Sequence, residues 1–151
     1  WTFSGLSDYD QDVIIEFEAT IPNFALAHEG SMQFSILPSH DLFQSFASLS
    51  KRRYPVDIGY PREYVDRHTY VAPPGWEFTE LPSALSVNQE GSPWWFELGS
   101  TGEGQATAVL TARLGFNSYR VPVSEYDGFR GFCSQVDDVM GKRAHLTEVK
   151  P

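Results

Sequence analysis

Apolar and polar side chains alternate with a period of two along much of the chain, which is the spacing of a strand with one buried face. The best such stretch covers residues 12–20, where Val13, Ile15 and Phe17 share one side. Residues 31–37 repeat the alternation after a Glu29-Gly30 turn. We therefore predict two strands here, forming a hairpin-like pair.

Prolines organise the centre of the chain, residues 52–82, and exclude a helix from it because each fixes its own φ and restricts the preceding residue to extended backbone. Residues 64–71 and 76–79 are predicted strands, joined by a tight Pro73-Pro74-Gly75 connection. The alternation places Trp76 and Phe78 on the buried face and their neighbours Glu77 and Thr79 in water.

Further strands follow this centre. Residues 84–87 and 94–98 form a predicted pair, and residues 99–104 form a glycine-rich hairpin turn. Residues 105–114 alternate cleanly and residues 119–123 would complete the sheet. The expected core face of the segment 105–114 consists of Ala106, Ala108, Leu110, Ala112 and Leu114.

One segment, residues 124–140, has the spacing of three and four that defines an amphipathic helix. Ser124 is its expected N-cap and Gly141 its expected C-cap. Its apolar positions are Tyr126, Phe129, Cys133, Val136 and Met140. Residues 38–51 fit either a loop or a short helix, and residues 143–149 fit either a last strand or a segment packed across the surface.

These elements predict a mainly β fold, an antiparallel β-sandwich of immunoglobulin-like type with one C-terminal amphipathic helix. At 151 residues and 41% hydrophobic, the sequence is long enough for a core without disulfides or metals, so we expect a single domain over 1–151. Because the sequence opens on Trp1 rather than Met, we interpret it as a fragment of a longer chain.

The net charge of −9 is uneven, since residues 1–50 hold seven acids and no Lys or Arg. Phosphate binding needs clustered cations, and the only cluster is Lys51-Arg52-Arg53, so nucleic acid is not an expected partner. No apolar stretch has the length of a membrane span. We also expect no cofactor, because the chain has a single cysteine and scattered histidines.

Candidate chemistry is sparse. Cys133 falls in the middle of the predicted helix on its apolar face, which favours a core role over a nucleophile. Asp8, Asp10 and Asp12 resemble the start of a calcium loop, but Val13 and Ala19 stand where such a loop needs Gly and Glu. A solvated acidic turn is the better interpretation, and calcium binding stays open.

Trp94 and Trp95 are the remaining candidates. Adjacent residues of a strand point to opposite faces, so at least one indole is available to be exposed. An exposed Trp can stack on a sugar or anchor a peptide. The alternative is one Trp in the core and the other covered by the helix or a neighbouring domain.

Three motifs together resemble the C-terminal β-sandwich module of bacterial transglutaminase-like proteins, in which a domain of unknown function accompanies a papain-like core. The resemblance covers about residues 10–147. The motifs are Arg53-Tyr-Pro-Val-Asp-Ile-Gly-Tyr-Pro61, then Pro74-Gly-Trp76 with Leu81-Pro82, and Val123-Ser-Glu-Tyr-Asp-Gly-Phe-Arg-Gly-Phe132 with Val136-Asp137.

The resemblance implies a periplasmic or extracellular, non-catalytic accessory module whose partner is the transglutaminase-like domain of the same chain. Cys133 does not match the catalytic Cys of such domains, so no catalytic residue is carried over. In this interpretation the acidic segment with Asp8, Asp10 and Asp12 meets a basic surface at the join between domains. The alternatives are a glycan- or peptide-binding module using Trp94 or Trp95, and a small hydrolase.

Overall fold

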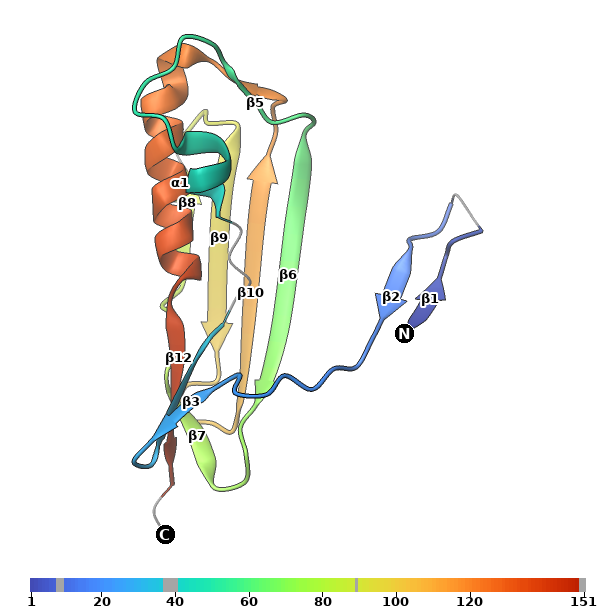
Figure 1. The fold of residues 1–151 in the computed structure, drawn as a ribbon, viewed down its shortest axis with the longest axis vertical. Coiled ribbons are helices and arrows are strands. Elements are labelled where there is room, and N and C mark those ends of the chain that lie inside the picture. The colour runs from blue at the N-terminus through green and yellow to red at the C-terminus, as the bar shows by residue number, and fades with distance from the viewer. Residues whose placement is uncertain (8–9, 37–40, 89, 150–151) are drawn as a thin grey trace.

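The computed structural model describes residues 1–7, 10–36, 41–88 and 90–149. It confirms a mainly β fold of several antiparallel sheets with one C-terminal α-helix, α1 (Tyr126–Met140) (Figure 1). The strands are β1 (Thr2–Ser4), β2 (Ile14–Glu16), β3 (Leu26–His28), β4 (Ser31–Ser35), β5 (Val56–Asp57), β6 (Arg62–Val71), β7 (Trp76–Glu80), β8 (Leu85–Asn88), β9 (Trp94–Thr101), β10 (Thr107–Phe116), β11 (Arg120–Val121) and β12 (Arg143–Glu148).

The larger sheet has the order β6-β10-β9-β8, and β10 is its longest interior strand. Alternate residues of β10 are buried, as predicted, although Ala106 lies before the strand and is exposed. The buried set is Ala108, Leu110, Ala112, Leu114 and Phe116. Cross-strand register carries the same alternation into β6 and β9, so each of these strands presents one face to the core and one outward.

Helix α1 lies over one end of the core face of this sheet (Figure 1). Phe129 is fully buried there, with its ring centroid 5.1 Å from Trp94 and 6.4 Å from Phe116. The predicted helix is confirmed, and so is Gly141 at its C-cap. The predicted N-cap is wrong, because Ser124 belongs to a 3₁₀ turn (Val123–Glu125) and Glu125 occupies the cap position without a side-chain bond.

The other end of the same face is covered by a second sheet with the order β3-β4-β12-β7. Its contact with the larger sheet is aromatic, because the ring of Phe34 on β4 lies 5.0 Å from that of Tyr70 on β6. Within the second sheet, the ring of Phe34 lies 6.4 Å from that of Phe78 on β7. Residues 143–149 thus provide a strand, β12, which is one of the two predicted alternatives. Both sheets and α1 share one hydrophobic core.

The segment before β5 is attached to α1 by hydrogen bonds between its backbone and side chains of the helix. Asp137 accepts from the N–H groups of Leu42 and Phe43 at 2.9 and 2.7 Å, where a π-helical turn (Phe43–Ala47) begins. The Tyr126 hydroxyl donates to the carbonyl of Leu49 at 2.6 Å. The short-helix alternative for this segment is therefore correct for residues 43–47, while residues 37–40 lie outside the described part.

Two predicted strand arrangements are wrong, and a third pair of neighbouring strands divides between sheets. Residues 12–20 form only the short β2, which pairs with β1, whereas β4 pairs with β3 and β12, so the two segments make no hairpin. Strands β6 and β7 flank the Pro73-Pro74-Gly75 turn as predicted but belong to different sheets. Strand β11 pairs with β5 and does not complete the larger sheet. In each case a strand lies within the predicted segment, and its partner was set by the tertiary fold.

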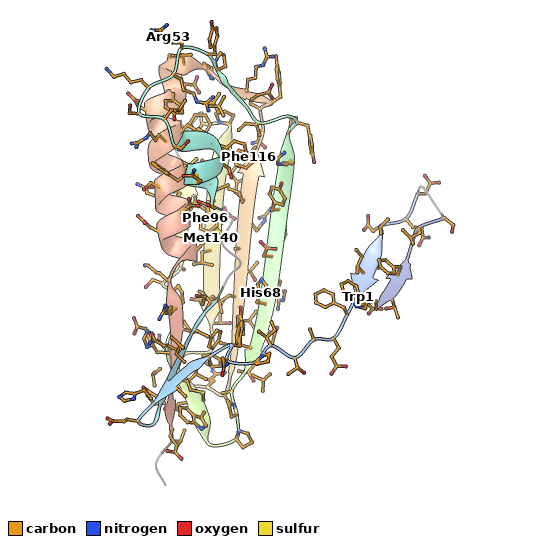
Figure 2. The ribbon with its side chains drawn as sticks, in the orientation of Figure 1. Trp1, Arg53, His68, Phe96, Phe116 and Met140 are labelled. Atoms are coloured by element: carbon orange, nitrogen blue, oxygen red, sulfur yellow. The ribbon has the colours of Figure 1, made fainter. Side chains whose placement is uncertain are left out.

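Residues 1–25 are called the N-terminal arm, and its described part lies apart from the rest of the molecule except at its end, where Phe24 and Ala25 contact the core. Figure 1 shows the β1–β2 hairpin standing clear of the sheets, and Figure 2 shows Trp1 on this hairpin, far from Phe96 and Phe116 in the core. The alternation over 12–20 predicted a buried face, yet every residue of that range is exposed. No surface in the described structure covers it.

Candidate interaction surfaces

Trp94 and Trp95 point to opposite faces of β9, as the alternation predicted. Trp94 is 5% exposed and packs beneath α1 against Phe129 and Phe132. Trp95 is half-buried on the other face, which we call the open face; it consists of the outward residues of β6, β10, β9 and β8. Of the two candidates, only Trp95 therefore presents its indole on the open face.

The ring of Trp95 lies flat on the sheet because its cross-strand neighbour is Gly115. A Cβ atom at Gly115 would lie 2.2 Å from Cε2 of the indole, which no real contact allows. The absence of a side chain at Gly115 thus leaves the space that the indole ring occupies. The guanidinium of Arg113 lies 5.2 Å from the Trp95 ring centroid, at cation–π distance.

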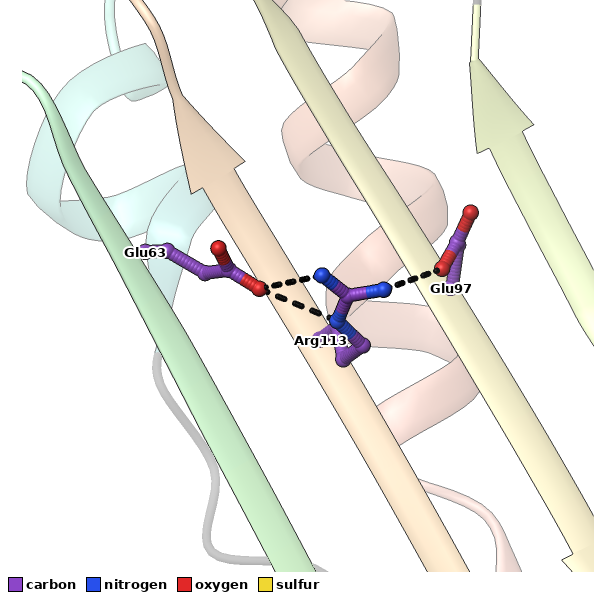
Figure 3. Close-up of polar contacts among 3 residues, drawn as sticks. All are labelled: Glu63, Glu97 and Arg113. Atoms are coloured by element: carbon purple, nitrogen blue, oxygen red, sulfur yellow. Dashed lines mark hydrogen bonds and ion pairs between the residues drawn. The ribbon is translucent and has the colours of Figure 1, made fainter.

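Arg113 joins three strands on the open face (Figure 3). Its Nη2 and Nε donate to Oε1 of Glu63 on β6 at 2.7 and 3.0 Å, and its Nη1 donates to Oε2 of Glu97 on β9 at 3.4 Å. The hydrogen bond that Arg113 donates to Glu63 is the main cause of a raised pKa for Arg113. All three side chains are nearly half exposed, so this array orients Trp95 more than it stabilises the fold.

A shallow hollow of about 400 Å³ lies beside this array on the open face. It forms at Gly99, where a Cβ would meet no atom within 4 Å. Arg67, Thr101, Val109 and Thr111 line it, which gives a cation, two hydroxyls and an apolar wall. Such a lining suits a polar ligand with stackable rings or an extended chain.

The N-terminal arm is the second surface. Its large apolar side chains are about half exposed or more, and Trp1 and Phe17 stack only on each other, with centroids 5.3 Å apart. Asp10 and Asp12 are exposed on the arm, and Asp8 lies outside the described residues. The exposed apolar set is Trp1, Phe3, Leu6, Val13, Ile14, Ile15, Phe17, Ile21 and Phe24.

Cys133 is placed where it cannot act as a nucleophile. It is fully buried in the middle of α1, and burial raises the pKa of its thiol to about 12, with a further rise from the Asp137 carboxylate. A reactive cysteine needs the opposite shift. Among the described residues, no group of three or more His, Cys, Asp or Glu side chains is arranged to hold a metal ion.

The histidines are dispersed. His28 and His145 lie 3.9 and 4.0 Å from Glu29 and Glu80 at the surface. His68 is stacked on Tyr70 with 6.0 Å between ring centroids. His40 lies outside the described residues.

Sequence reasoning missed Arg113, Glu63, Gly115 and the hollow at Gly99. Gly99 and Gly115 could have been singled out, because an isolated glycine in a strand often marks a site where another group approaches the backbone closely. The pairing of Arg113 with Glu63, 50 residues away, needed the strand order.

A family model described as "Domain of Unknown Function with solved-structure structure" (DUF3858) matches residues 32–146. Comparisons with curated proteins and with solved structures gave no match. Within the described residues, no helix is long and apolar enough to cross a membrane. The match begins at β4 and therefore leaves the N-terminal arm outside it.

Proposed function

The chain belongs to the DUF3858 family, a domain of unknown function, and from that premise we propose that it is a non-catalytic interaction module. The observation that carries the proposal is the N-terminal arm, which precedes the family segment and holds its apolar side chains in solvent. An isolated two-stranded hairpin is at best marginally stable in water. The arm therefore has the character of a docking element that is buried when its partner is present.

A non-catalytic role is supported by the buried Cys133, whose thiol keeps its proton through the neutral range. On the open face, Arg113 donates hydrogen bonds to the carboxylates of Glu63 and Glu97. An arrangement of this kind fixes geometry and lacks the poised acid–base pair of a hydrolase.

For the partner we propose a transglutaminase-like catalytic domain of the same chain, in an exported protein. The motifs over 53–61, 74–82 and 123–137 support this, because they resemble modules that accompany such domains. The arm also carries Asp10, Asp12, Glu16 and Glu18 without a single base, which favours a basic partner surface.

The test is titration calorimetry between the 151-residue chain and the separately expressed region encoded before Trp1. We expect the paired change Ile15→Ser and Phe17→Ser to weaken association at least about tenfold, about 1.4 kcal/mol. Replacing Asp8, Asp10 and Asp12 by Asn should weaken it less and reduce its salt dependence, because exposed charges are screened over about 8 Å.

The matched control is Val71→Ser, which removes an apolar side chain that is 75% exposed on β6 rather than on the arm. Binding that responds to Val71→Ser and not to the arm changes would move the interface to the larger sheet. A preceding region without a transglutaminase-like fold would refute the proposed partner. The docking role of the arm would then be decided by the titration alone.

Trp95 favours a second function, the binding of a glycan or peptide on the open face. The ring lies flat beside the hollow at Gly99 and is oriented by Arg113. Titration of ¹⁵N-labelled protein with chitotetraose and with maltotetraose should then shift the indole N–H signal of Trp95 and leave that of Trp94 in place. Trp95→Ala should abolish the shifts of the surrounding amides.

A further inference from the structure

A groove runs between α1 and β8, on the edge of the larger sheet opposite to β6. It consists of two adjoining hollows of about 330 and 450 Å³, both of which are lined by Trp94 and Gly128. The second hollow continues along the helix to Gly131, Phe132 and Gln135. Neither hollow includes Trp95 or the N-terminal arm.

The helical wall of the groove is open because of two glycines, Gly128 and Gly131. Glycine destabilises a helix interior relative to alanine, so its presence there needs a reason. At Gly131 a Cβ would meet nothing within 4 Å, and the backbone has helical conformation. Packing among the described residues therefore does not require Gly131, and the open space beside it is available to a molecule outside the chain.

The opposite wall is the free edge of a strand. In the described part of the chain β8 pairs only with β9, so the other edge of Leu85–Asn88 has no strand beside it. Its residues Ser86, Val87 and Asn88 line the second hollow. Backbone N–H and C=O groups at such an edge can pair with an added strand.

The charges along the groove have one sign. Glu90 and Glu125 line the first hollow and Asp127 the second, while neither lining includes Lys, Arg or His. The floor under the glycines is aromatic, formed by Trp94 and Phe132. A matching ligand is therefore cationic at the Glu90 end and apolar where it passes Gly131.

We propose that this groove binds an extended peptide segment, which adds to β8 as a further strand. About four residues of the peptide pair with the edge, a small apolar side chain enters the space at Gly131, and a Lys or Arg lies at the Glu90–Glu125 end. An edge strand beside a helix supplies main-chain hydrogen bonds for affinity and side-chain pockets for selection. The site is separate from the arm and does not depend on the proposed catalytic partner.

The experiment begins with selection of phage-displayed random dodecapeptides on the 151-residue chain. Enriched sequences should contain a Lys or Arg two to four residues from a small apolar residue, and one of them, made synthetically with blocked ends, is the probe. Gly131→Gln should weaken its binding at least tenfold, measured by fluorescence anisotropy. The control Asp138→Gln, at an exposed position of α1 outside the groove lining, should change it less than twofold.

A second set of variants tests the charges of the groove by replacing Glu90 and Glu125 with Gln. Binding should weaken three- to tenfold and lose part of its salt dependence, whereas Glu103→Gln with Glu148→Gln, which removes two exposed acids elsewhere, should have no such effect. Thermal unfolding separates folding from binding, because Gly131→Ala should raise the melting temperature. If Gly131→Gln does not fold, Gly131→Ser takes its place.

Amide shifts of the labelled protein should cluster on Ser86–Asn88 and Gly128–Gln135 when the peptide is added. Failure to enrich any peptide would overturn the proposal. So would binding that survives Gly131→Gln, or shifts that map to the open face around Trp95.

Discussion

A single absent methyl group decides how Trp95 lies. Its ring occupies the place where a side chain at Gly115 would stand, and this lets Arg113 reach both the ring and Glu63. Gly99, on the same face of the neighbouring strand, has no ring over it and lines a hollow instead. The two glycines thus have different roles: Gly115 makes room for the Trp95 ring, whereas Gly99 leaves a hollow open to solvent.

Gly115→Ala and Gly99→Ala should therefore have opposite effects. The first forces the indole off the sheet and should cost about 1–3 kcal/mol, as overpacking does. The second meets open space and should be neutral or stabilise by up to about 1 kcal/mol, because alanine loses less backbone entropy than glycine. Urea unfolding of both variants checks this, and equal destabilisation would mean that the ring of Trp95 is not fixed over Gly115.

The buried Cys133 thiol lowers the stability of the fold at alkaline pH. Its folded pKa of about 12 lies above the ordinary value of 9.0, so the unfolded thiol ionises first as the pH rises. Its contribution to stability is full below pH 9 and falls by about 1.4 kcal/mol per pH unit from there toward pH 12.

We expect the difference in unfolding free energy between wild type and Cys133→Ala to shrink between pH 8 and pH 10.5, measured with urea. The native thiol should also fail to react with Ellman's reagent at pH 8 and react once unfolded in guanidinium. Rapid native labelling would show that α1 leaves the thiol accessible.

At the scale of the element, α1 is held by an aromatic cluster and by one acid. The ring of Phe129 contacts those of Trp94, Phe116, Phe46 and Phe132, with no exposed surface. Phe129→Ala should cost about 3–5 kcal/mol, as large-to-small core changes do. A urea midpoint that barely moves would show that the helix is not docked through this ring.

Asp137 on the same helix accepts from two backbone N–H groups of the π-helical turn. Asp137→Ala leaves both donors without their partner and should cost about 1–3 kcal/mol. Hydrogen exchange at Leu42 and Phe43 should accelerate with it. Asp138→Ala, an exposed neighbour, is the control and should leave both amides protected.

Elements were more predictable than their partners. The spacing of Tyr126, Phe129, Cys133, Val136 and Met140 defined α1 because a helix satisfies its own backbone hydrogen bonds. A strand does not, and a period of two is the same whichever strand lies beside it. The placement of Trp94 and Trp95 on opposite faces followed from alternation alone. Which of them is exposed, and the contacts of Arg113 with Trp95 and Glu63, depended on the order β6-β10-β9.

At the scale of the whole molecule, the body and the arm differ in how they are stabilised. The body shares one core among two sheets and α1, while the arm contributes no residue to the fully buried part of it. At the end of the arm, Ala25 packs against that core and the ring of Phe24 lies 5.2 Å from the core residue Phe34. The body should therefore keep its stability when the arm is removed.

Limited proteolysis tests this separation. Glu-C should cleave first after the exposed Glu16 and Glu18, and the product should melt within a few degrees of the intact chain. Trypsin is the control, because residues 1–50 contain no Lys or Arg and the arm should survive it. A large drop in melting temperature after the Glu-C cut would place the arm within the folded body.

Strand β12 sits between β4 and β7 in the second sheet, although it follows every other strand in the chain. During synthesis, β4 can therefore pair only with β3, and β7 has no partner strand of its sheet, until the ribosome has released residues 143–148. Phe34 and Phe78 remain without the cover of Ala144 and Leu146 for the same interval. This domain must fold after translation of its whole length, and a chain that terminates before β12 exposes two unpaired strand edges to its neighbours in the cell.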